Sequence, residues 1–220
     1  DLIESLGMEA AQYVRAHATG NELGEMLIYA FLEEVLHAPK LMSAIELSSG
    51  NRCAGIHFLT IPNTDVNYEL VYGASYLHGD ITQAVDNAFE TIENMEKTRL
   101  SGMELVNSAE FNKCIDIKTA HLIKKIIIPE DGGDSGAGTA YGVLLGYTLD
   151  LNPEDYAPIE YTNAAIKRIE LDIEVALDRI HTKISELKLG YKSFYIYVLP
   201  FNNADGDKKS IMNDLIGGTV

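Results

Sequence analysis

One strand candidate holds the positions at which this chain could do chemistry. Residues 68–76 read Tyr-Glu-Leu-Val-Tyr-Gly-Ala-Ser-Tyr, a pattern that predicts a strand running into a turn and then a helix. Side chains two residues apart lie on one face of a strand, so an acidic residue and a lysine at this spacing could bind Mg²⁺ and orient a water for attack on a phosphodiester. Here the two positions hold Ala74 and Tyr76, which supply neither a carboxylate nor an amine. Hydrolysis therefore depends on which groups surround them.

The first half of the chain supplies the elements that would position this strand. A helical period over 21–36 predicts a helix that Asn21 caps and Pro39 ends. Strands are predicted over 41–47, 55–61 and 68–76, with a hairpin turn at 63–65 between the last two. A second helix is predicted over 80–96, with one apolar face made by Ile81, Ala84, Val85, Ala88, Phe89, Ile92 and Met95.

The second half is richer in helix. It is predicted to contain helices over 110–127 and 157–187, a Gly/Asp-rich loop over 130–138, and strands over 141–149 and 192–200. In the long helix the apolar face is predicted to be Ile166, Ile169, Ile173, Leu177, Ile180, Ile184 and Leu187. We interpret residues 1–220 as a single α/β domain and, because the chain starts at Asp1 without an initiating Met, as the C-terminal part of a longer protein.

The order helix, three strands, helix, strand matches the PD-(D/E)xK nuclease core, a mixed sheet flanked by helices. In that core an acidic residue on the first helix joins the strand residues around the metal. Glu25 is the matching acid in this chain. The alternative is that Glu25 is a solvated carboxylate on a helix surface, which is the common state of such a residue.

Several short stretches, taken in order, resemble one family. They are 24–29 with His37-Ala38-Pro39-Lys40, 55–58, 73–76, 80–81 with 84–89, 141–143, and 193–195 with 198–201. Together they make the chain similar to the HamA C-terminal domain family, the nuclease-like subunit of Hachiman anti-phage defence. The resemblance implies a PD-(D/E)xK-like fold, a metal-dependent DNase activity, and a helicase partner that senses DNA and releases that activity.

The chain departs from the family pattern at the positions that are expected to bind the metal and activate water. The family has an Asp before the Gly of the second strand, where this chain has Ala54, and then Gly-Glu-Ser-Lys, where this chain has Ala74 and Tyr76 in place of the Glu and Lys. Of the expected set only Glu25 remains, so no bound metal is expected, and Mg²⁺ would be the cofactor only if the site were active. Restoring Asp, Glu and Lys at the three positions is expected to recover metal binding.

A relocated metal site is the alternative to a degenerate one. His78 and Asp80 lie just beyond the strand and could join Glu25 as ligands. Glu69 is expected to point to the opposite face from Ala74, and His57 to point away from Ala54 and Ile56, because strand side chains alternate between faces.

The charge balance bears on partners. The chain has 17 Lys and Arg against 33 Asp and Glu, a net charge of −16, which repels phosphate backbones. We therefore expect DNA to be reached indirectly, through the helicase partner, with the helix over 157–187 as the docking surface. The sequence contains no apolar run long enough to span a bilayer, and Cys53 and Cys114 are expected to be reduced thiols of a cytoplasmic protein.

Three functions remain open at this point. The first is a defence subunit that docks to a helicase and has a degenerate active site. The second is an active Mg²⁺-dependent DNase, with relocated ligands or a deliberately altered site. The third is a binding module with no role in nucleic-acid chemistry.

Overall fold

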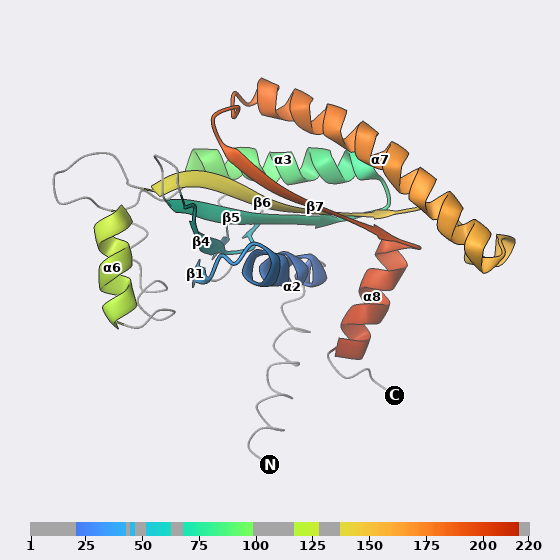
Figure 1. Ribbon diagram of the computed structural model, residues 1–220, viewed down its shortest axis with the longest axis horizontal. Coiled ribbons are helices and arrows are strands. Elements are labelled where there is room, and N and C mark those ends of the chain that lie inside the picture. The colour runs from blue at the N-terminus through green and yellow to red at the C-terminus, as the bar shows by residue number, and fades with distance from the viewer. Residues whose placement is uncertain are drawn as a thin grey trace, which may run out of the picture.

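A five-stranded mixed sheet forms the centre of the molecule (Figure 1). The computed structural model describes residues 21–42, 45–46, 52–62, 68–98, 117–127 and 137–215. In order across the sheet, the strands are β1 (Lys40–Met42), β4 (Ile56–Thr60), β5 (Tyr68–Leu77), β6 (Ala137–Thr148) and β7 (Ser193–Phe201). Strand β4 is antiparallel to both β1 and β5, whereas β5, β6 and β7 run parallel to one another. Two short strands, β2 (Ile45–Glu46) and β3 (Arg52–Cys53), pair separately.

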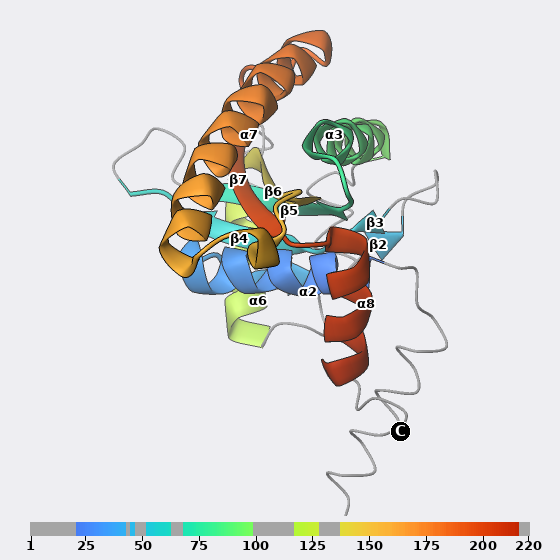
Figure 2. The ribbon, with the colours of Figure 1, turned by 90° about the vertical axis from the view of Figure 1, so that its right-hand side faces the viewer.

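Helices cover both faces of this sheet (Figures 1 and 2). On one face lie α3 (Ile81–Thr98) and α7 (Pro158–Glu186), and on the other lie α2 (Glu22–Ala30) and α8 (Ala204–Leu215). A π-helical segment, η1 (Phe31–Val35), continues α2, and η2 (Pro153–Asp155) precedes α7. A further helix, α6 (Ile117–Ile127), lies to one side in Figure 1. The predicted α/β fold with a mixed sheet flanked by helices is confirmed.

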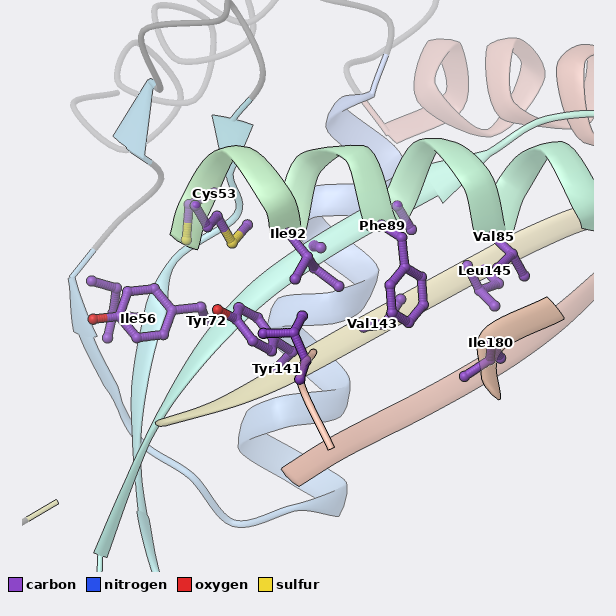
Figure 3. Packing of buried hydrophobic residues seen from close by; sticks show 14 of the residues in the cluster. Cys53, Ile56, Tyr72, Val85, Phe89, Ile92, Tyr141, Val143, Leu145 and Ile180 are labelled. Atoms are coloured by element: carbon purple, nitrogen blue, oxygen red, sulfur yellow. The ribbon is translucent and has the colours of Figure 1, made fainter. Parts of the chain in front are cut away.

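The strands sort their side chains into two apolar layers. Tyr72 and Ala74 of β5 pack toward α3 and α7, whereas Val71 and Leu77 pack toward α2. The α3 layer is the larger, and the whole predicted apolar face of α3 is buried in it, as Figure 3 shows for Val85, Phe89 and Ile92 over the sheet. Because every second residue of a strand points to the same side, this division fixes which functional side chains can meet.

The elements differ from the predictions in three places. The predicted strand over 41–47 is two strands, β1 and β2, that belong to different sheets. Strand β3 and helix α8 were not predicted, because β3 is too short to show a period and α8 has little apolar pattern. The turn at 63–65, residues 110–116 and most of the loop over 130–138 lie outside the described residues. In the part of the chain that is described, no helix combines the length and the apolar character needed to cross a bilayer.

Candidate functional site

The start of α2 lies directly on β5, with no room for a side chain between them. A Cβ atom built on Gly24 would lie 2.8 Å from Leu77 Cδ1 and 2.9 Å from Ser75 Oγ. The Asn21 side chain, just before the helix, donates from Nδ2 to the Ser75 carbonyl oxygen and to Ser75 Oγ, each at 3.1 Å. The Asn21 side chain therefore joins the helix to the strand. Its position had predicted that it would cap the helix, and it makes no side-chain capping hydrogen bond.

Glu25 follows this contact in the first turn of α2 and is half-buried. Its carboxylate is close enough to Cys53 to raise the pKa of that thiol slightly, although burial is the main cause of the rise to about 11. Cys53 is a free, buried thiol, as predicted, and Cys114 lies outside the described residues. The acid retained from the family pattern thus sits between α2 and the sheet, where a carboxylate could face a ligand.

Ala54 lies on the same side of the sheet as Glu25. Its N–H donates to the Gly73 carbonyl at 2.8 Å, while the Gly73 N–H donates to the Gly55 carbonyl at 2.9 Å, so two residues face one across the strands. Gly55 has a φ of +146°, a conformation that glycine adopts readily. This bulge interrupts the alternation, and Ala54 packs with the α2 layer.

Ala74 and Tyr76 lie on the other side of the sheet. Ala74 is fully buried in the α3 layer, and Tyr76 packs against that layer with its ring 5.8 Å from the ring of His78. Burial raises the pKa of the Tyr76 hydroxyl. The four positions that match the family motif are therefore divided: Glu25 and Ala54 face the α2 side, while Ala74 and Tyr76 face the α3 side. On β5, Gly73 and Ser75 lie on Glu25's side of the sheet, as do Val71 and Leu77.

His78 and Asp80 lie at the carboxyl end of β5 and are engaged in the structure of the chain. The Asp80 carboxylate accepts a hydrogen bond from the Gln83 N–H at 2.8 Å and so caps α3, while the carboxylate itself remains exposed. The His78 backbone N–H donates to the Gly146 carbonyl at 3.0 Å. Among the described residues, no three His, Cys, Asp or Glu side chains are grouped so that they could hold a metal ion.

The buried acid of β5 has a structural role. Glu69 accepts hydrogen bonds from the hydroxyls of Ser193 at 2.5 Å and Tyr195 at 2.8 Å, both on β7. Glu69 therefore ties β5 to β7 across β6, and it points away from Ala74, as predicted.

His57 is buried beside η1, and its Nδ1 lies 2.8 Å from the Ala38 carbonyl oxygen. The ring of Tyr29 lies 5.8 Å away, and the Tyr29 hydroxyl donates to Glu33 at 2.7 Å. Burial lowers the pKa of the His57 imidazole, so the neutral ring is favoured. The predicted alternation away from Ala54 does not hold, because the bulge at Gly55 lets both side chains face α2.

The buried neutral His57 predicts a pH effect on stability. The unfolded chain binds a proton at this imidazole as the pH falls below about 6.5, but the folded protein resists protonation until a lower pH. Its contribution is therefore present above the unfolded pKa and is lost as the pH falls through the folded pKa. We expect the difference in Tm between the parent and His57→Asn to shrink from pH 7.5 to pH 5. Thermal unfolding followed by circular dichroism across this range measures it, and a difference that stays constant would contradict the assignment.

Sequence reasoning missed the contact of Asn21 with Ser75. Two signals for it were present in the sequence. Gly24 allows a helix to approach a strand closely, and Ser75 is one of the odd-numbered residues of the strand, which all share one face.

Asn203, Asp205 and Asp207 have a spacing that resembles a calcium loop, but in the structure they lie at the start of helix α8. The Asn203 side chain accepts from Gly206 N–H at 2.9 Å, and Asp207 accepts from Asn203 N–H at 3.0 Å.

Comparison with known protein families finds a match for this chain. The family model described as HamA matches residues 3–215, almost the whole chain. No curated protein and no solved structure matches. The match covers the α2–β5 contact, the sheet and α7 alike.

Proposed function

Because the chain belongs to the HamA family, whose members are components of the Hachiman antiviral defence system, we propose that it is the subunit that docks to a helicase and does not itself cut DNA. Membership places it in a system with other subunits. The helicase partner and the loss of cutting are the proposal.

The observation that carries this proposal is which residues occupy the motif positions. Ala54, Ala74 and Tyr76 stand where the family pattern has Asp, Glu and Lys, and they are divided between the two faces of the sheet. Mg²⁺ requires oxygen ligands that converge on an octahedral site and include one or two carboxylates. Glu25 is a single carboxylate, and Ala54 and Gly73 offer no side-chain oxygen to join it. The residues present therefore do not make a converging set of ligands, and we derive no metal-dependent step for the site.

The charge of the chain supports contact with DNA through the partner. A protein that binds a duplex directly does so by placing Lys and Arg against phosphates. With a net charge of −16, this chain offers phosphates an unfavourable field. A helicase subunit would supply the cations and bring the chain to DNA.

A metal-binding and cleavage assay tests the proposal. We expect no nicking of plasmid DNA in Mg²⁺ or Mn²⁺, and calorimetry with Mn²⁺ should detect no site tighter than about 1 mM, as expected of a lone carboxylate. Glu25→Gln is the informative variant, and Glu34→Gln, an exposed acid of η1, is its control. A micromolar Mn²⁺ site, or nicking, that is lost in Glu25→Gln and kept in Glu34→Gln would establish an active DNase instead.

Affinity measurements test the partnership. The chain should co-purify with a helicase subunit of the same defence system and bind that helicase more tightly than duplex DNA at physiological salt. Submicromolar binding of DNA by the chain alone, with no helicase recovered, would overturn the docking role. Binding to neither would favour the third hypothesis, a module without a role in nucleic-acid chemistry.

A further inference from the structure

Helix α7 carries apolar side chains that the rest of the molecule leaves exposed. Four of them share one side of the helix and form what we call the α7 stripe: Ile159, Ile166, Ile173 and Leu177, with 70%, 50%, 36% and 46% exposure. Their spacings of seven, seven and four residues place them in line along the helix axis. Over 18 residues the stripe is ~27 Å long. Three of these residues, Ile166, Ile173 and Leu177, belong to the apolar set predicted from the sequence for this helix, and the structure leaves them exposed.

The remaining sides of α7 define where the stripe lies. Ala176 and Ile180 point into the core above the sheet. Arg179 and Lys183 reach Asp86 of α3 at 2.8 Å and 3.4 Å. Because each residue advances about 100° around a helix, the stripe lies on the opposite side of the buried row from these two cations. It therefore faces away from α3, on the outer flank of the long helix that extends along the top of the molecule in Figure 1.

The charges of α7 are distributed unevenly around this stripe. Three of its four Lys and Arg side chains form ion pairs, since Arg168 pairs with Asp172 at 2.9 Å and Arg179 and Lys183 pair with Asp86. By their positions on the helix, three exposed acids border the stripe on its solvent side, and we call them the acidic rim: Glu170, Glu174 and Asp178. Within the part of the chain that the structure describes, these three make no ion pair. Lys167 lies nearby and leaves the rim acidic on balance.

We propose that the α7 stripe and the acidic rim are the surface that docks to the partner subunit, and that the partner presents an apolar ridge bordered by Lys or Arg. This inference rests on the proposed function and specifies its interface. Among the described residues these carboxylates make no ion pair, and an apolar strip beside them complements such a surface in both shape and charge. A second copy of this chain would add a second excess of carboxylates, and nucleic acid would meet the rim with phosphates, so charge disfavours both occupants.

Substitutions on two sides of α7 test the apolar part. The test pair is Ile166→Gln with Ile173→Gln in the stripe. The control pair is Leu171→Gln with Val175→Gln, which are also exposed apolar residues of α7 but lie on the other flank. Titration calorimetry with the helicase subunit that co-purifies with this chain should show at least ~30-fold weaker binding for the test pair and less than ~3-fold for the control. Because all four side chains are exposed, both variants should keep the parent Tm.

Charge reversal tests the rim. Glu170→Lys with Glu174→Lys should slow association with the helicase and reduce the dependence of affinity on salt. If the parent binds but the stripe variant binds equally well, or if the control pair loses as much affinity, the α7 surface is wrong while the docking function stands. If the parent does not bind the helicase at all, both fail. Sedimentation would then show whether the stripe instead joins two copies, which would also overturn the partner assignment.

Discussion

Ala74→Glu is expected to destabilise the protein by roughly 3 kcal/mol or more, even though the resemblance noted in the sequence implies Glu at this position. Ala74 is fully buried between β5 and the α3 layer. A larger side chain there must displace its neighbours, and its carboxyl group enters an apolar environment without hydrogen-bond donors supplied for it. Urea unfolding followed by circular dichroism measures the loss.

Ala54→Asp is the matched control for this substitution. Ala54 is half-buried and lies on the α2 side, so its carboxylate would keep some contact with water. We expect it to cost about 1 kcal/mol or less, mostly from its proximity to the charge of Glu25. Equal stability of the two variants would mean that position 74 faces α2 beside Glu25, and the metal site would have to be reconsidered.

This geometry also revises an expectation drawn from the sequence. Restoring Asp, Glu and Lys at 54, 74 and 76 together was expected to recover metal binding. In the structure the two β5 side chains project toward α3 while Glu25 and Ala54 face α2, so three substitutions do not build one set of ligands. The triple variant is expected to lose stability and to remain without a tight metal site.

The sequence predicted well those elements that have a strong period and a single partner layer. Helix α3 has a regular apolar face and was placed to within two residues at each end, and β5 was placed to within one. In α7 the sequence predicted the helix correctly, but it did not separate buried residues such as Ile180 from exposed ones such as Ile166 and Leu177. The period of the apolar residues shows that one side of a helix is apolar, but it does not show which part of the protein covers that side.

The site was harder to predict because it depends on which face of the sheet each side chain lies on, and residue type does not indicate this. A single bulge at Gly55 decides that Ala54 and His57 face α2, and no composition signal marks it before the strands are paired. The contact of Asn21 with Ser75 spans 54 residues of sequence, so neither residue alone indicates the other. Glu25 could be identified by resemblance, whereas the residues that surround it required the fold.

Gly24→Ala is expected to weaken the attachment of α2 to β5, at a cost of roughly 1–3 kcal/mol in the free energy of unfolding. The new methyl group would lie 2.8 Å from Asn21 Oδ1, 2.8 Å from Leu77 Cδ1 and 2.9 Å from Ser75 Oγ, closer than such atoms can approach. Because alanine otherwise favours a helix over glycine, a loss of stability here can come only from this contact. Gly190→Ala is the control, since a Cβ at Gly190 meets no atom within 4 Å.

The same substitution separates the site from the proposed interface. Gly24→Ala shifts the start of α2, which carries Glu25, and leaves the α7 stripe on the opposite side of the sheet untouched. If docking through α7 is the function of the chain, Gly24→Ala should lower Tm while helicase affinity, measured below that Tm, stays within about threefold of the parent. A large loss of affinity with little change in Tm would place the interface at α2 and Glu25 instead.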